Sequence, residues 1–145
     1  MVAIHDEETN SFIKALTKEI IWLGGYRKVD GKNDWGWIDG STWKYSKWTK
    51  GQPDDHSGVE DYLDFNWGGA GLWNDRSHGS KLPFVCQKCR SGWHYFHRTG
   101  KCYNYFQAKI SATEANDFCK SVEVSRFLCI QSNIFDLILR TNHFK

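Results

Sequence analysis

The sequence predicts an α+β fold, in which short helices and short strands flank a long irregular segment. Three patterns along the 145 residues indicate it. Apolar side chains recur at helical spacing near the start, glycine and aromatic residues without a helical period fill the middle, and a closing strand and a hairpin follow. A chain of this length corresponds to a single small domain.

The chain begins with a predicted apolar strand at 1–4 and a helix that follows it. Four apolar side chains recur at helical spacing behind a polar start: Phe12, Ile13, Leu16 and Ile20. We expect Thr9 or Asn10 to cap this helix, because a side-chain oxygen at that position accepts from the free amides of the first turn.

From 22 to 75 the pattern changes to glycine and aromatic residues, which predicts long loops and short strands. Seven of the eight tryptophans lie in this segment: Trp22, Trp35, Trp37, Trp43, Trp48, Trp67 and Trp73. A closing strand is predicted at 82–86. The two aromatic-rich arms of 93–106 predict a hairpin that turns at Arg98-Thr99-Gly100.

The end of the chain repeats the pattern of its beginning. Residues 112–120 suit a helix that buries Ala115 and Phe118, and a further strand and helix follow between 127 and 138. This last unit parallels the strand and helix of 1–19. Such a repeat suggests that the chain is a segment of a tandem array of domains, which runs from the middle of one domain to the middle of the next.

Composition excludes several classes of protein. Lys and Arg number 19 against 17 Asp and Glu, so a net charge of +2 argues against a basic stripe for nucleic acid. An aromatic share of 16% is incompatible with intrinsic disorder. No run approaches the roughly 18 apolar residues of a membrane span. The first residues also lack the basic and apolar regions of a signal peptide, which by itself indicates a cytosolic chain.

Six short motifs in the first half occur in a characteristic order: Trp37-Ile-Asp-Gly-Ser41, Tyr45-Ser-Lys-Trp48, Gly51-Gln-Pro-Asp54, Glu60-Asp61, Trp73-Asn-Asp75 and Pro83-Phe-Val-Cys86. Together they resemble the C-terminal half of a C-type lectin domain. The second half is similar to the N-terminal half of the same domain through another set: Cys89, Gly92-Trp93, Cys102-Tyr103, Ala115 and Phe118-Cys119. The resemblance covers nearly the whole chain, but the C-terminal half of the family domain comes first and its N-terminal half follows.

The resemblance implies a C-type lectin-like fold with short antiparallel strands, two flanking helices and a long ligand-binding loop at 22–80. Residues 1–88 would be the C-terminal half, and 89–145 the N-terminal half of a second or permuted domain. Because the first and last strands of the family pair, joining the halves at 87–88 requires little chain. Two alternatives stay open: a fragment of a longer tandem protein, or a permuted domain whose surplus 126–145 exchanges with a second copy to form a swapped homodimer.

The resemblance also implies the disulfides. Cys86 of the closing strand would pair with Cys119 of the first helix, and Cys89 with Cys102, leaving Cys129 as a buried thiol. Such bonds, together with the family, indicate an extracellular, secreted protein, although this chain shows no signal peptide.

A second internal bridge of the family would fall at Tyr62 and His78, where neither residue is cysteine. Both halves of that bond are lost together. The long loop therefore lacks a cross-link that is typically worth about 2–4 kcal/mol.

A calcium site is the main functional expectation. Five oxygen-bearing side chains match the residues that ligate the principal calcium in the family: Gln52, Asp54, Glu60, Asn74 and Asp75. Ca²⁺ takes six to eight oxygens from carboxylates, amide carbonyls, water or substrate, and three carboxylates suit a divalent ion. The resemblance further implies that Pro53 follows a cis peptide bond.

The same residues imply carbohydrate binding, because sugar hydroxyls complete the calcium shell in this family. Gln-Pro-Asp implies galactose-type glycans or glycoproteins, and Glu-Pro-Asn mannose-type ones. The aromatic residue that usually stacks on galactose is replaced by His56, so His56 or Trp67 is expected to take that role. An auxiliary calcium is a further expectation, at Asp30, Asp34, Asp55 and Asp61.

Other residues have simpler interpretations. The resemblance places Trp37, Trp48 and Trp73 in the core rather than in a sugar platform. Histidines outside the loop are expected on solvated or half-buried faces: His5, His94 and His97.

Three competing functions were weighed. Zinc binding by Cys86, Cys89, Cys102 and the nearby histidines is disfavoured, because only one Cys-x2-Cys pair is present. No hydrolase or phosphate-loop motif appears, so no enzyme is predicted. The stronger rival is a calcium-independent, protein-binding lectin-like module, which the missing bridge and His56 favour.

Overall fold

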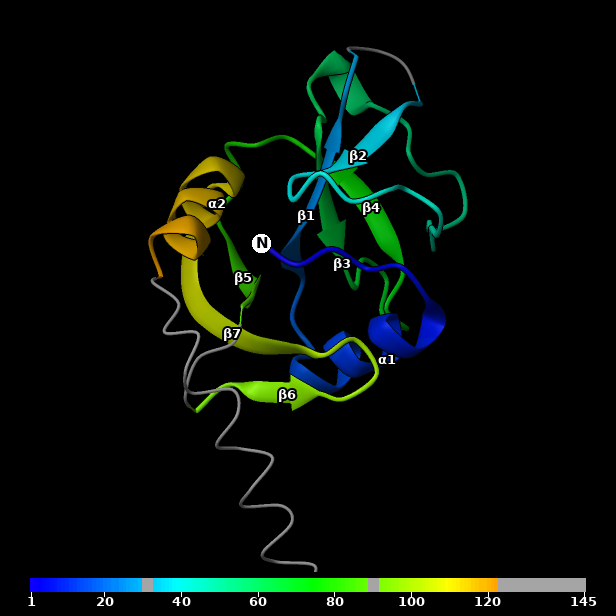
Figure 1. The fold of residues 1–145 in the computed structure, drawn as a ribbon. Coiled ribbons are helices and arrows are strands. Elements are labelled where there is room, and N and C mark those ends of the chain that lie inside the picture. Colours follow the sequence, from blue (N-terminus) through cyan, green and yellow to red (C-terminus); the bar gives the residue numbers. More distant parts are fainter. Residues whose placement is uncertain (30–32, 89–91, 123–145) are drawn as a thin grey trace, which may run out of the picture.

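The computed structural model describes residues 1–29, 33–88 and 92–122. It has the predicted α+β architecture, with two helices and one mixed sheet (Figure 1). The elements in chain order are α1 Glu7–Leu16, β1 Ile21–Arg27, β2 Trp35–Trp37, the 3₁₀ turn His56–Gly58, β3 Tyr62–Phe65, β4 Trp73–Arg76, β5 Leu82–Gln87, β6 His94–Phe96, β7 Lys101–Ile110 and α2 Ala112–Ser121.

Helix α1 confirms the predicted period at Phe12, Ile13 and Leu16, but it ends before Ile20, and the predicted cap is wrong. Asp6 is the N-cap, and its carboxylate accepts a 2.7 Å hydrogen bond from the amide of Thr9. Asp6 has the extended backbone of a cap, whereas Thr9 and Asn10 already lie inside the helix. The helix buries Ile13 and contacts the β6–β7 hairpin through stacked rings of Phe12 and Phe96.

The sheet has the strand order β4-β3-β1-β5-β7-β6, with β2 paired to β1. Among the paired strands of the described residues, only β1 and β5 run parallel, at Trp22 and Phe84, and an isolated parallel bridge joins Trp48 to Trp73 of β4. The apolar segment 1–4 is not a strand, contrary to the prediction. It is nevertheless buried between β1 and β5, because the amide of Val2 donates to Val85 and its carbonyl accepts from Gly24.

Strands from both parts of the chain form this one sheet. The closing strand β5 pairs antiparallel with β7 from Leu82 to Gln87, and the predicted hairpin is formed by β6 and β7. A disulfide between Cys86 and Cys119 then ties β5 to α2, the pair that the resemblance implied. The sheet and this bond therefore hold residues 92–122 against residues 1–88.

Helix α2 begins with a capping box, in which Ser111 and Glu114 satisfy each other's free amides. It lies beside β5 and β7 (Figure 1) and buries Ala115, as predicted. Phe118 is 40% exposed, so its predicted burial is wrong. The helix turns Cys119 toward the sheet instead, and Phe118 covers the edge of the rings of β5 and β7.

Tryptophans dominate the core, as the resemblance implied. Trp37 and Trp73 are buried and Trp48 is partly buried. The indole of Trp73 donates 2.9 Å to the buried amide oxygen of Asn10, which joins α1 to β4. This bond fixes one end of the strand that carries the site.

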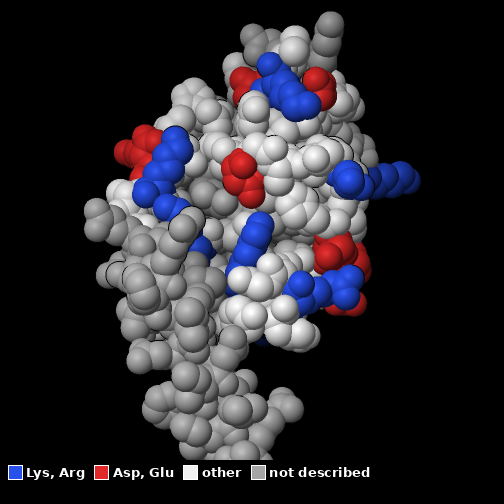
Figure 2. Space-filling model, in the orientation of Figure 1, with Lys and Arg blue, Asp and Glu red and all other residues white. Residues whose placement is uncertain are grey.

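The surface and the remaining predictions can be reported briefly. His94 and His97 are exposed and His5 is half-buried. On the face drawn in Figure 2, acidic and basic side chains lie next to one another, in keeping with the small net charge. No helix among the described residues is long and apolar enough to cross a membrane. Cys129 and the second predicted strand and helix lie outside the described residues.

Candidate functional site

Three carboxylates converge at one end of the sheet. Oxygens of Asp54, Glu60 and Asp75 lie within 4.8 Å of one another, although they come from a loop and from β4. The loop enters this position through a cis peptide bond at Gln52-Pro53, as the resemblance implied. The cluster brings together hard, negatively charged oxygen donors of the kind that Ca²⁺ prefers.

Asp75 is the buried centre of the cluster and organises the loop. Its Oδ2 accepts from Nη2 of Arg27 at 2.6 Å and from the amide of Asp55 at 2.8 Å. Its Oδ1 accepts from the amide of Asp54 at 3.2 Å. These bonds offset the cost of burying a carboxylate and hold the loop next to β4.

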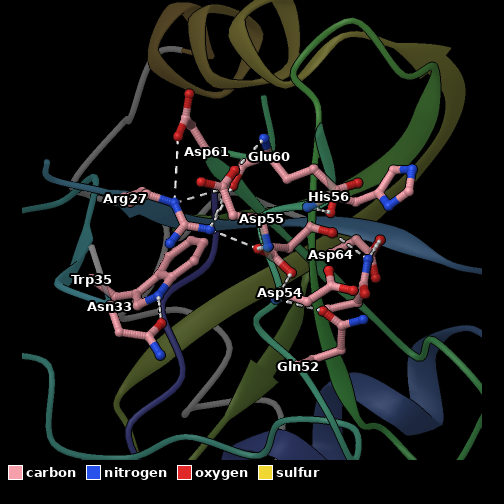
Figure 3. Close-up of polar contacts among 12 residues, drawn as sticks. Arg27, Asn33, Trp35, Gln52, Asp54, Asp55, His56, Glu60, Asp61 and Asp64 are labelled. Carbon is pink, nitrogen blue, oxygen red and sulfur yellow. Dashed lines mark hydrogen bonds and ion pairs between the residues drawn. The ribbon is translucent and has the colours of Figure 1, made fainter. Parts of the chain in front are cut away.

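Arg27 is a functional residue that the sequence analysis missed. Besides Asp75, its guanidinium donates to the carbonyl of Glu60 at 3.0 Å and lies 3.4 Å from the carboxylate of Asp61 (Figure 3). The ring of Trp35 covers it at 4.8 Å. Two adjacent cations at the end of an apolar strand, Arg27 and Lys28, were the only signal in the sequence, and they do not indicate which acids Arg27 meets.

The residues named for an auxiliary calcium are not gathered as a second site. Asp55 and Asp61 lie beside Arg27, at 3.9 and 3.4 Å, and Asp34 pairs with Lys28 at 3.0 Å. Asp30 lies outside the described residues. Within 1–29, 33–88 and 92–122, Asp54, Glu60 and Asp75 form the only close group of three or more such ligands.

The loop closes on itself around Glu60. Asp55 and Ser57 have left-handed backbones, at φ 48° and 62°, and this tight path lets Asp55 accept from the amide of Glu60. Glu60 in turn accepts from the amide of His56 at 3.1 Å. Burial raises the pKa of Glu60, and the negative charges of Asp75 and Asp54 raise it further. A divalent cation would reverse this effect.

The two amide side chains of the set are also oriented. Oε1 of Gln52 accepts from the amide of Asp54 at 3.0 Å, which leaves its Nε2 as a donor. Nδ2 of Asn74 donates to Asp64 at 3.2 Å and to the carbonyl of Asp75. The carbonyl oxygen of Asn74 is therefore the atom available to a metal, and Gln52 and Asn74 line the same cleft as Asp54 and Glu60.

A cleft of about 210 Å³ adjoins the cluster. It is lined by Gln52, Asp54, His56, Glu60, Trp67, Asn74 and Arg76. Asp75 lies beneath it, fully buried. Trp67 is 40% exposed, and the guanidinium of Arg76 lies 4.9 Å from its ring centre. The structure thus brings the residues predicted for the principal calcium and the sugar to one place, with Asp75 joined to them through Asp54 and Glu60, and it adds Arg76.

The cysteines and the missing bridge can now be placed. Cys86 and Cys102 are both disulfide-bonded, so neither is a thiolate available to zinc. Cys89, the expected partner of Cys102, lies outside the described residues. Tyr62 and His78, at the positions of the absent bridge, have ring centres 6.2 Å apart.

Comparison with known proteins identifies the family. Residues 1–88 match the family model described as Lectin C-type domain. The chain belongs to the C-type lectin domain family, as the motifs indicated.

Two curated relatives match more than half of the chain. A protein named "Lectin" from Pleurodeles waltl is 34% identical over 93 residues, which are 60% of this chain and 54% of that protein. "Galactose-specific lectin nattectin" from Thalassophryne nattereri is 34% identical over 94 residues, which are 61% of this chain and 58% of that protein. The chain spans a little over half the length of these relatives.

A third relative matches across both halves. "C-type mannose receptor 2" from Homo sapiens is 26% identical over 137 residues, which are 82% of this chain and 9% of that protein. Because residues 1–88 are less than 82% of the chain, this match continues into the second half. The order of the two halves therefore also occurs in a much longer protein.

Proposed function

We propose that this chain is a calcium-dependent carbohydrate-binding module for galactose-type glycans. The observation that carries the proposal is the convergence of Asp54, Glu60 and Asp75 beside a cleft that two oriented amides also border. A bound Ca²⁺ would supply charge neutralisation and open coordination positions for sugar hydroxyls. Members of the family are lectins, and one relative is named as galactose-specific.

The donor and acceptor order of the cleft supports a galactose-type preference. Gln52 has an amide N–H donor beside its oxygen, which keeps a second lone pair for the metal, whereas the carboxylate of Asp54 only accepts. Of two neighbouring sugar hydroxyls, one must then accept from Gln52 and the other must donate to Asp54. A Glu-Pro-Asn loop would offer the reverse order, so the preferred sugar differs in the orientation of its diol.

An aromatic surface borders the same cleft. Trp67 exposes 40% of its surface there, and His56 lies on the opposing loop. The apolar face of a sugar ring packs on such an exposed aromatic side chain. Trp67 thus supplies the stacking partner that the sequence lacks directly after Gln-Pro-Asp.

Retention on immobilised galactose, with and without a calcium chelator, tests this function. We expect retention in calcium, elution by chelator, and weaker retention on mannose. Asp75→Asn should abolish retention, whereas the matched control Asp117→Asn, on exposed α2, should leave it unchanged. A folded protein that neither resin retains would refute the proposal and favour the calcium-independent, protein-binding alternative.

We also infer that residues 92–122 complete the domain of residues 1–88 within one chain, in permuted order. The pairing of β5 with β7 and the disulfide Cys86–Cys119 support this inference. Disulfide-bonded cysteines further favour an oxidising, extracellular location.

Disulfide mapping distinguishes a permuted domain from a swapped homodimer. Isotopically light and heavy chains are refolded together, and the peptides that Cys86 and Cys119 join are then identified by mass spectrometry. A permuted domain gives light–light and heavy–heavy pairs only. Mixed pairs would show that the second half completes a neighbouring molecule instead.

A further inference from the structure

We propose that Arg76 and Trp67 form a subsite for an acidic substituent, a sulfate ester or a carboxylate, on the glycan held at the calcium site. This inference deepens the proposed carbohydrate function and rests on it. Both side chains line the cleft that Gln52, Asp54 and Asn74 also line.

Strand geometry places Arg76 beside the metal ligands. Residues of β4 alternate between two faces, so Asn74 and Arg76 share one face while Trp73 and Asp75 point to the other. The register pairs Asn74 with Asp64 on β3. A basic side chain two residues after a metal ligand therefore reaches into the same cleft.

Two contacts hold the guanidinium in a fixed orientation. Its Nε donates to Oδ2 of buried Asp64 at 2.5 Å, and its Cζ lies 4.9 Å from the centre of the Trp67 ring. The side chain remains 21% exposed. A guanidinium restrained in this way loses little conformational entropy when it binds a ligand.

The terminal nitrogens of Arg76 are the part that points to a ligand. A guanidinium has five N–H donors, and in the described part of the chain only Nε of Arg76 donates to a protein group. The planar fork of the terminal nitrogens matches the two oxygens of a carboxylate or sulfate. The carboxylate of Asp64 offsets the charge of Arg76 but does not accept from its terminal nitrogens.

A simpler role for Arg76 would be to hold Trp67 and neutralise Asp64. Both roles predict a loss of sugar binding when Arg76 is replaced, so loss alone is not diagnostic. They differ in the response to acidic probes. A positioning residue would affect neutral and acidic galactosides equally, whereas a ligand-binding guanidinium affects the acidic ones more.

Titration of the full chain in calcium with three probes tests the proposal. The probes are methyl galactoside, methyl galactoside 6-sulfate and methyl galacturonide, which separate the neutral, sulfate and carboxylate cases. We expect at least one acidic probe to bind about tenfold more tightly than the neutral one, a difference of about 1.4 kcal/mol. Arg76→Gln should remove that ratio and Arg76→Lys should retain part of it.

Arg98→Gln is the matched control, because Arg98 is an exposed arginine that pairs with Asp6 and Glu8 instead. It should leave the ratio unchanged. Equal affinities for all probes in the unmodified chain would overturn the subsite, as would a ratio that Arg76→Gln leaves intact. Failure of every probe, neutral or acidic, would overturn the carbohydrate function itself, and the subsite with it.

Discussion

Replacing Glu60 by Gln should raise the stability of the calcium-free protein and lower that of the calcium-loaded protein. Glu60 shares a 4.8 Å cluster with Asp54 and Asp75, and among the described residues its carboxylate forms no ion pair. The guanidinium of Arg27 donates to the carbonyl oxygen of Glu60. Without a cation the third carboxylate therefore adds repulsion, and with a cation it adds a ligand.

The magnitudes follow from the geometry. Two unit charges 4.8 Å apart repel by about 1 kcal/mol in water and by about 3.5 kcal/mol at an effective dielectric constant of 20. Because Glu60 is partly exposed, we take the lower value, so Glu60→Gln should raise the apo free energy of unfolding by about 1 kcal/mol. Calcium at 100 times its Kd stabilises the unmodified chain by about 2.7 kcal/mol. A 100-fold weaker site would gain about 0.4 kcal/mol at that concentration.

Urea unfolding at neutral pH, in chelator and in excess calcium, measures both effects. The variant should be more stable than the unmodified chain by about 1 kcal/mol in chelator and less stable by about 1 kcal/mol in calcium. Asp117→Asn removes one negative charge on distant, exposed α2 and should shift neither curve appreciably. Equal destabilisation of Glu60→Gln under both conditions would refute this reasoning and make Glu60 a structural residue.

Three further changes test the fold around the site. Burial raises the pKa of Asp64 to about 6, against the opposing hydrogen bonds, so the folded state holds this proton more tightly than the unfolded chain. The unfolding free energy of the calcium-free protein should then fall by about 3 kcal/mol as the pH rises from roughly 4 to 6. Urea unfolding of Asp64→Asn should not show this fall, and parallel pH profiles of the variant and the unmodified chain would contradict the assignment. Replacing Cys86 and Cys119 by Ala opens a 33-residue loop and should lower the free energy of unfolding by about 4 kcal/mol in the same assay. An unchanged urea midpoint would contradict this. Trp73→Phe leaves the buried oxygen of Asn10 unpaired and should lower the unfolding free energy by about 2–4 kcal/mol, whereas a loss below about 0.5 kcal/mol would show that the bond contributes nothing.

Local patterns explain which parts of the fold could be predicted. The closing strand β5 is a short apolar run, and the hairpin of β6 and β7 has two aromatic-rich arms around a glycine turn. Helix α1 follows from its apolar period. Its cap was misplaced because several polar residues in a row all have capping side chains, and only the backbone of Asp6 decides among them.

Long-range contacts explain what could not be predicted. Arg27 lies 33 residues before Glu60, and nothing near it in the chain indicates which acids it meets. Phe118 and Cys119 both fit the apolar side of α2 on spacing alone. The position of β5, to which Cys119 is bonded, decides which of them is buried.

The arginine network also explains how the loop keeps its shape without the family's second bridge. The backbone of Arg27 donates to the carbonyl of Asp61 at 2.8 Å, and its guanidinium holds the carbonyl of Glu60 and the carboxylate of Asp75. Asp75 then holds the amides of Asp54 and the next residue. Both ends of the ligand loop are thereby tied to β1 and β4 by buried, charge-assisted bonds, which are stronger than neutral ones. Because the Arg27 guanidinium neutralises Asp75, this buried carboxylate can hold the amides of the loop in place, and the positions of Asp54 and Glu60 are set by bonds within the chain itself.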